Sequence, residues 1–458
     1  MNRRILILLT AVLTLCIALQ SQAQKVRKLP AGAYLKSAKI EIISGDTARY
    51  AGAIAMLDTL MIHYGPHAEG LYWLSQIQVD FVEKSSTPQQ KSVHIMKILS
   101  YADSLRRMCA DPAVDNKNKK DCDKWVSIVD SLKVKYWGEF YNRGVEQLNA
   151  AKEMQKEKEG ATDSVTIAFA EKGMKANSDS AIENLMVAIS VNPSDFRSYV
   201  AIGNVYDGQG KYEEALEWTK KGSEKVSDRS PLLIPLAMYN INLDRYCDAI
   251  PYFREFVAKN TGEVGTMYNL SICYSRCEQY DSAMSVYRQI LTQDSTHVEA
   301  ISRMGEYFIR GAKTASDSIS THSGEEGNAK MTAWKTDRDR AYDSSAFWFS
   351  KSFELKHDDA TTASQYALIQ ALRGKFEEAA VGYKRLCELQ SKDANNWIYL
   401  GDCYTQLKKF KDAVGAYEQA EAIDDSNIGM LEHMLDIYHE LRDAANADRM
   451  TAKLAKRK

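Results

Sequence analysis

The chain has 458 residues and a formal net charge of −2 at pH 7, with its Lys/Arg and Asp/Glu residues interspersed along the whole sequence. This distribution lacks the basic patch that nucleic-acid binding requires, so we expect no nucleic-acid partner. With only 8 prolines and 24 glycines, long disordered linkers are also excluded. The composition therefore indicates an ordinary folded protein.

The N-terminus has the pattern of an export signal. Arg3 and Arg4 precede an apolar run over residues 5–19, and small residues that suit a signal peptidase end at Ala23. We therefore predict a signal peptide over residues 1–23. The protein would be exported, and in a bacterium it would be periplasmic or associated with the cell envelope.

Membrane anchoring is the less favoured alternative. The apolar run is short for a membrane span and no other stretch is long and apolar enough, so we expect no direct membrane span. Lipidation at Cys16 is also not favoured, because a lipoprotein signal has a small residue before the cysteine and this chain has Leu15.

Residues 24–139 are the least regular part of the chain. Apolar periodicity predicts a degenerate helix hairpin over residues 33–66, followed by helices at 67–82 and 91–108. We interpret residues 24–139 as a divergent helical N-terminal region that shields the first regular repeat.

From residue 140 to residue 458 the sequence repeats itself. Alanines recur 34 residues apart in two series, since 215 minus 181 and 413 minus 379 both give 34. A 34-residue period is the signature of a solenoid of helix–turn–helix units. The alanines are Ala181, Ala215, Ala249 and Ala283, then Ala379, Ala413 and Ala447.

The residues around these alanines resemble the tetratricopeptide repeat (TPR) family. Trp397, Leu400, Gly401 and Tyr404 follow the pattern W-x2-L-G-x2-Y, with Ala413 next at the family's spacing. The resemblance implies an all-α fold: a right-handed TPR α-solenoid of antiparallel helix hairpins with a divergent helical N-terminal cap and about seven to eight repeats. The small residues would lie where helix A crosses helix B, because a larger side chain would push the helices apart.

Two repeats are interrupted between helix A and helix B. The insertions, near residues 150–176 and 311–339, are rich in Lys, Glu, Ser and Thr and contain helical patches. We expect lengthened helices that project from the solenoid. They could contact a partner or only decorate its edge, and decoration is the favoured interpretation.

The cysteines suggest disulfides. Cys109 and Cys122 bracket a polar, turn-rich loop, and in an exported protein we expect a disulfide to close it. Cys247 and Cys277 fall near the turns of neighbouring repeats, where they could bond or could be small buried residues.

The sequence contains no catalytic motif. It lacks H-E-x-x-H, G-x-S-x-G, a phosphate-binding glycine loop and a paired C-x-x-C. His63 and His67 stand four apart, but Gly65 and Pro66 between them break the helix that a metal site would need. We therefore predict a non-enzymatic protein without a cofactor or metal.

The resemblance implies that helix A lines a concave surface whose exposed positions contact a segment of a partner. Asparagine can bind a peptide backbone, and arginine can hold a carboxylate with two bonds. For any single position, a solvated helix surface is the competing interpretation. The concave positions are Arg197, Asn204, Asp207, Met238, Asn242, Tyr268, Asn269, Arg276, Arg303, Glu306 and Arg310.

The chain departs from the best-known TPR specificity, the carboxylate clamp for the C-terminal tails of chaperones. Asn204 and Asn269 belong to repeats two apart, and the helix A between them carries Pro231, Ile234 and Met238 at the equivalent positions. We infer that part of the groove takes hydrophobic side chains.

Two functions are compatible with these observations. The leading prediction is a non-enzymatic protein–protein interaction scaffold that binds a peptide or protein segment in its concave TPR groove, in the assembly of a cell-envelope complex. The alternative is a glycan-binding protein similar to the SusD family, which also carries TPR hairpins. That family is typically lipidated and presents aromatic residues on loop insertions, whereas here Trp334 is the only tryptophan in either insertion.

Overall fold

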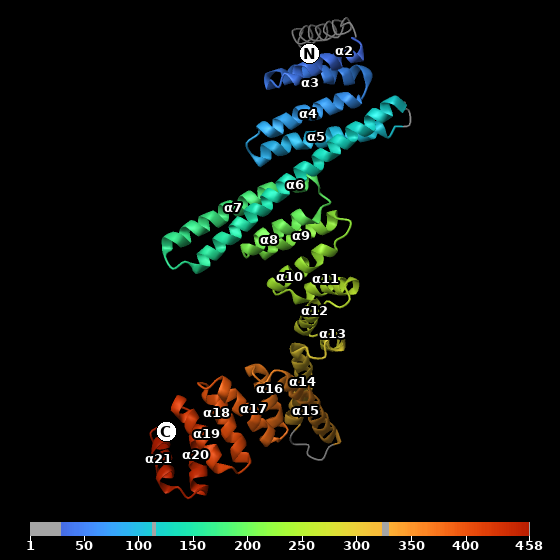
Figure 1. Ribbon diagram of the computed structural model, residues 1–458. Coiled ribbons are helices and arrows are strands. Elements are labelled where there is room, and N and C mark those ends of the chain that lie inside the picture. The colour runs from blue at the N-terminus through green and yellow to red at the C-terminus, as the bar shows by residue number, and fades with distance from the viewer. Residues whose placement is uncertain (1–28, 112–115, 323–328, 458) are drawn as a thin grey trace, which may run out of the picture. The chain divides into compact units, whose positions relative to one another are not determined.

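The computed structural model describes residues 29–111, 116–322 and 329–457 (Figure 1). These residues form twenty helices, α2 to α21, and no strand, so the predicted all-α class is confirmed. The predicted signal peptide, residues 1–23, lies outside the described residues, as does Cys16. The chain divides into two compact units, Met1–Leu243 and Asp244–Lys458.

The first unit consists of four antiparallel helix pairs followed by a single helix. Its pairs are α2 (Ala31–Ile43) with α3 (Thr47–Tyr64), α4 (Ala68–Lys84) with α5 (Pro88–Cys109), α6 (Asn116–Gly160) with α7 (Ser164–Val191), and α8 (Phe196–Gly208) with α9 (Tyr212–Lys225). The single helix α10 (Ser230–Asn242) is the last element of this unit.

The second unit opens with a single helix and continues as five pairs. It contains α11 (Tyr246–Lys259), then α12 (Val264–Arg276) with α13 (Tyr280–Gln293), α14 (Val298–Thr321) with α15 (Ala329–Leu355), α16 (Ala360–Leu372) with α17 (Phe376–Leu389), α18 (Ala394–Gln406) with α19 (Phe410–Ile423), and α20 (Ile428–Glu440) with α21 (Ala444–Ala455).

The periodic alanines lie at the helix crossings. All seven are buried, with at most 3% of their surface exposed. The small residues of helix A have the same role: a methyl group added at Gly401 would lie 2.5 Å from a ring carbon of Tyr417, and one added at Gly305 would lie 2.5 Å from the ring of Phe349. Close helix packing therefore explains why the repeat selects small residues at these places.

The turns between helix A and helix B share one backbone geometry. A residue with positive φ recurs one period apart, since both 408 minus 374 and 442 minus 408 give 34. Gly374 adopts this conformation with φ of 72°, whereas Lys408 and Arg442 adopt it with φ of 56° and 59°. The left-handed region favours glycine, so the non-glycine turns carry a small local strain.

The predicted insertions are extensions of both helices in two pairs. The tip of α6 and α7, the longest pair in Figure 1, is closed by an ion pair between Lys158 and Glu171 at 2.8 Å. In the extension of α14 and α15, the rings of His322 and Trp334 lie 4.8 Å apart.

The region boundary that we predict at residues 139 and 140 falls inside helix α6. No proline interrupts residues 116–160, so nothing in the sequence stops the helix there. Tyr136 and Phe140, on either side of the boundary, belong to the same buried core. The division into compact units falls later, after Leu243.

The structure joins both cysteine pairs. Cys109 pairs with Cys122, with Cα atoms 5.7 Å apart, and Cys247 pairs with Cys277, with Cα atoms 5.6 Å apart. The second pair connects the start of α11 to the residue that follows α12. Among the described residues, Cys273, Cys387 and Cys403 are free and buried.

Candidate functional site

A groove of about 470 Å³ lies between α12, α13 and α14 in the second unit. Four of the predicted concave residues line it: Arg276, Arg303, Glu306 and Arg310. Because three of these are cations, we call it the basic groove. Three tyrosines that are not among the predicted concave positions complete its wall, namely Tyr280, Tyr287 and Tyr307.

Arg276 and Arg310 have no carboxylate partner within the described part of the chain. Arg310 donates a hydrogen bond of 2.7 Å to the hydroxyl of Tyr280, and its guanidinium stacks 3.9 Å from the centroid of that ring. The guanidinium of Arg276 lies 5.5 Å from the ring centroid of Tyr246. Both arginines therefore retain donors that can bind a carboxylate with two bonds.

Arg303 and Glu306 neutralise each other. Arg303 donates to Glu306 over 2.6 Å, and Gln365 on α16 donates to the other carboxylate oxygen over 3.0 Å. Burial lowers the pKa of Arg303. The hydrogen bond to Glu306 and the charge of that carboxylate raise the pKa by more, so it lies above its ordinary value. The free positive charge of the groove thus comes from Arg276 and Arg310.

The concave residues of α8 lie in the first unit and do not line the basic groove. Arg197 is held by Asp195 at 2.7 Å, and its guanidinium lies 4.1 Å from the ring centroid of Trp137. Asn204 accepts a hydrogen bond of 3.2 Å from Tyr239 and lines a cavity of about 320 Å³ between α6, α7 and α8. Neighbouring protein atoms desolvate the carboxyl of Asp207 and raise its pKa, whereas the charge of Lys152 lowers it by less.

The remaining predicted residues also lie outside the basic groove. On α10, Met238 is half-buried and Asn242 is exposed. On α12, Asn269 is half-buried, and the ring of Tyr268 lies 5.4 Å from that of His297. The hydrophobic groove that we infer at Met238 stays a prediction.

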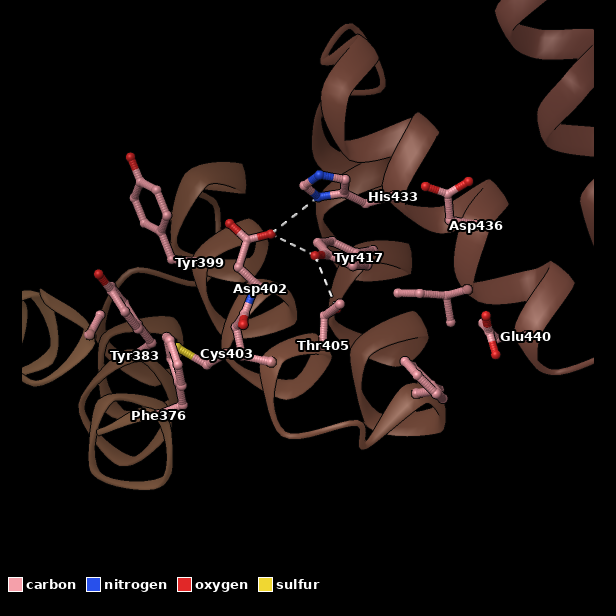
Figure 2. A pocket seen from close by; sticks show the side chains of 14 residues that line it. Phe376, Tyr383, Tyr399, Asp402, Cys403, Thr405, Tyr417, His433, Asp436 and Glu440 are labelled. Atoms are coloured by element: carbon pink, nitrogen blue, oxygen red, sulfur yellow. Dashed lines mark hydrogen bonds and ion pairs between the residues drawn. The ribbon is translucent and has the colours of Figure 1, made fainter. Parts of the chain in front are cut away.

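A second groove, of about 560 Å³, runs along α17, α18, α19 and α20 (Figure 2). Its carboxylates are Asp402, Asp436 and Glu440, and no lysine or arginine is among the described residues that line it. We call it the acidic groove. Five aromatic side chains form much of its wall: Phe376, Tyr383, Tyr399, Phe410 and Tyr417.

Asp402 is fixed in place, whereas the other two carboxylates are not. The hydroxyl of Tyr417 donates to Asp402 over 2.6 Å, and His433 lies 3.5 Å from the same oxygen (Figure 2). Burial first, and then this hydrogen bond, raise the pKa of Tyr417, so its hydroxyl remains a donor. Asp436 and Glu440 are exposed and make no hydrogen bond or ion pair within the described residues.

The sequence contained a signal for the acidic groove that our choice of concave positions did not use. Asp402 and Asp436 occupy equivalent places in successive repeats, because 436 minus 402 gives 34. Arg276 and Arg310 are related in the same way, because 310 minus 276 also gives 34. The shared spacing of Asp402 and Asp436 would therefore have identified the second groove.

The thiol that lines the acidic groove is not activated as a nucleophile. Cys403 lines the acidic groove, but burial raises the pKa of its thiol to about 12, so it is protonated at neutral pH. The described residues contain no group of three His, Cys, Asp or Glu side chains that could hold a metal ion. No helix among residues 29–111, 116–322 and 329–457 is both long and apolar enough to cross a membrane.

Comparison with known families agrees with the repeat geometry. Models of the tetratricopeptide repeat match residues 196–223 and 266–299, and the model described as "Anaphase-promoting complex, cyclosome, subunit 3" matches residues 338–420. The chain is a tetratricopeptide repeat protein. The matched segments span α8 to α9, α12 to α13, and α15 to α19, so they include parts of both grooves.

Similar curated proteins match only part of this TPR chain. Tetratricopeptide repeat protein 8 of Mus musculus is 31% identical over 123 residues, which is 26% of this chain and 24% of that protein. TPR repeat-containing protein MJ1428 of Methanocaldococcus jannaschii is 22% identical over 256 residues, which is 54% of this chain and 42% of that protein. The chain therefore spans less than half the length of these relatives.

Solved structures with some likeness include MamA, with 19% identity, a TM-score of 0.31, and coverage of 42% of this chain and 96% of that one. The C-terminal part of a TPR repeat-containing protein from Cytophaga hutchinsonii has 14% identity, a TM-score of 0.43, and coverage of 57% and 94%. YrrB, described as a TPR protein with an unusual peptide-binding site, has 18% identity, a TM-score of 0.31, and coverage of 46% and 97%.

Proposed function

We propose that this TPR protein is a non-enzymatic scaffold that binds an acidic segment of another protein in the basic groove. The observation that carries the proposal is the pair Arg276 and Arg310, which line one groove from equivalent positions of successive repeats and lack carboxylate partners among the described residues. Two guanidinium groups repeated along a groove suit carboxylates that are spaced along an extended chain. The tyrosines between them supply apolar surface for the same segment.

We further propose that the protein works outside the cytoplasm, in the assembly of a cell-envelope complex. The export pattern of residues 1–23 supports this location. The pairing of Cys109 with Cys122 and of Cys247 with Cys277 supports it independently, because disulfides persist in oxidising compartments.

The SusD-like alternative has less support. Trp334, the tryptophan in the insertions, packs against His322. A clear hit on a glycan array that survives loss of both Arg276 and Arg310 would favour the alternative over the scaffold.

The proposed site is tested with a glutamate-rich peptide and a length-matched glutamine-rich peptide, each titrated into the full chain by calorimetry. We expect the glutamate-rich peptide alone to bind. Arg276→Gln combined with Arg310→Gln should weaken it about a hundredfold, because two charge-assisted contacts are lost. The matched control is Arg254→Gln with Arg288→Gln, which removes the same charge from exposed positions of α11 and α13 that do not line the groove.

Equal weakening by both double variants would reduce the effect to net charge and contradict the site. A second experiment uses the immobilised full chain to capture envelope proteins from its own source. A partner retained by the control variant and lost by the groove variant would support the scaffold.

A further inference from the structure

We propose that the acidic groove is a second recognition site, and that it binds a lysine- or arginine-bearing segment of a partner protein. This goes beyond the basic groove, since it assigns a separate site with the opposite charge preference. It rests on the proposed function only in that the ligand is again a protein segment.

The charge of the groove is unsatisfied. Asp436 and Glu440 lie on α20 and make no hydrogen bond or ion pair within the described residues, and no described lysine or arginine lines the groove with them. His433 contacts Asp402, not these two carboxylates. Figure 2 shows Asp402, Tyr417 and His433 together, with Asp436 and Glu440 farther along α20. A ligand that carries cationic side chains would therefore meet two free carboxylates and one that is already oriented.

The aromatic wall points to the same kind of ligand. The rings of Tyr383 and Tyr399 lie 5.4 Å apart, on α17 and α18, beside Asp402. Ammonium and guanidinium groups bind to the faces of such rings. The aliphatic stem of lysine or arginine would lie against the same rings.

One tyrosine in this wall has a hydroxyl without a hydrogen-bond partner. Tyr383 is only 6% exposed, and its hydroxyl makes no hydrogen bond within the described residues, although the residue lines the groove. Burial raises the pKa of this hydroxyl to about 12, so it is neutral and offers a lone pair to a cationic donor. An ammonium or guanidinium group of a bound segment would give this hydroxyl a hydrogen-bond partner.

The dimensions favour a peptide side chain over a free metal ion. The groove encloses about 560 Å³, which accommodates several residues of an extended segment. The described residues contain no cluster of ligands that could hold a metal. The occupant is thus a basic protein segment that runs along the groove from Asp402 to Asp436.

The test compares a lysine-rich peptide with the glutamate-rich peptide and the length-matched glutamine-rich peptide, each titrated into the full chain. We expect the lysine-rich peptide to bind, the glutamine-rich peptide not to bind, and Asp436→Asn with Glu440→Gln to weaken the lysine-rich peptide about tenfold. The same variant should leave the affinity for the glutamate-rich peptide unchanged. Tyr383→Phe, which keeps the ring and removes the hydroxyl, should weaken the lysine-rich peptide by a smaller factor.

The matched control is Glu432→Gln with Asp448→Asn, which removes the same two charges from exposed positions outside the groove. If this control weakens the lysine-rich peptide as much as the groove variant does, the attraction is nonspecific and the proposal is wrong. Absence of binding by the lysine-rich peptide at low salt also overturns it. If the lysine-rich peptide binds and the glutamate-rich peptide does not, the second site stands and the proposed function of the basic groove fails.

Discussion

The basic groove and the acidic groove are built from the same repeat and differ at exposed positions where the repeat pattern does not specify the residue type. Arg276 ends α12 in the basic groove and Gln406 ends α18 in the acidic groove, and these places are equivalent because 283 minus 276 and 413 minus 406 both give 7. One period later, the basic groove has Arg310 and the acidic groove has Glu440. The buried positions of the repeat are the same in kind, since Ala283 and Ala413 are both buried. The framework therefore sets where a groove forms, and a few surface positions set its charge.

The two grooves also differ in how they are held. The disulfide between Cys247 and Cys277 ends beside Arg276, whereas Cys387 and Cys403 near the acidic groove are free thiols. We predict that Cys247→Ser with Cys277→Ser lowers the free energy of unfolding by about 3 kcal/mol, since the bond restricts the unfolded chain. Affinity for the glutamate-rich peptide should fall with it, and affinity for the lysine-rich peptide should not.

Urea denaturation followed by circular dichroism measures the first effect, and calorimetry measures the second. Cys109→Ser with Cys122→Ser is the control, because this pair lies in the first unit. If alkylation of the unreduced protein labels Cys247 and Cys277, the two residues are not bonded and the prediction is wrong.

Inverting the charge of the acidic groove should reverse its preference. Asp436→Lys with Glu440→Lys should weaken the lysine-rich peptide by about a hundredfold, because attraction becomes repulsion. If charge alone separates the two grooves, the variant gains a second site for the glutamate-rich peptide, which the binding stoichiometry reports. A stoichiometry that stays unchanged would show that the tyrosines of the basic groove are also required. Glu432→Lys with Asp448→Lys is the control for net charge.

The close crossing of α18 and α19 at the acidic groove can be disturbed without changing the basic groove. A methyl group at Gly401 would lie 2.5 Å from the ring of Tyr417, which holds Asp402 through its hydroxyl. Gly401→Ala should therefore cost about 2 kcal/mol of stability through overpacking, and should weaken only the lysine-rich peptide. Gly415→Ala on α19 is the control, because its methyl group would meet no atom within 4 Å. Equal unfolding midpoints for the two variants would mean that the crossing tolerates a larger residue.

These differences show which parts of the molecule the sequence could predict. The 34-residue period predicted the helix pairs and the burial of residues such as Ala413, because helix crossings accept only small side chains. The period did not predict that α6 is continuous. Tyr136 and Phe140 lie on either side of the predicted region boundary, yet both belong to one buried core. Local periodicity carries no information about which core a helix joins.

The grooves were predicted less completely than the fold. The structure brings Arg276 and Arg310 into one groove because they share a register. Asn204 lies elsewhere, because its side chain accepts from Tyr239 and lines a different cavity. That hydrogen bond joins residues 35 apart in the chain, and only tertiary packing decides it. The sequence therefore could not show which exposed residues of helix A find a partner within the protein.

The smallest predicted effect concerns the turn beside each groove. Lys408, between α18 and α19, has φ of 56°, and Glu278, between α12 and α13, has φ of 60°. Glycine adopts this region without steric cost, so Lys408→Gly and Glu278→Gly should each raise the free energy of unfolding by up to about 1 kcal/mol. The gain is partly offset, because glycine also makes the unfolded chain more flexible. Gly374→Ala, at φ of 72° in the equivalent turn, should lower stability by a similar amount. Unfolding midpoints measure all three, and a loss of stability in Lys408→Gly without a loss in Glu278→Gly would show that the lysine side chain itself stabilises the turn beside the acidic groove.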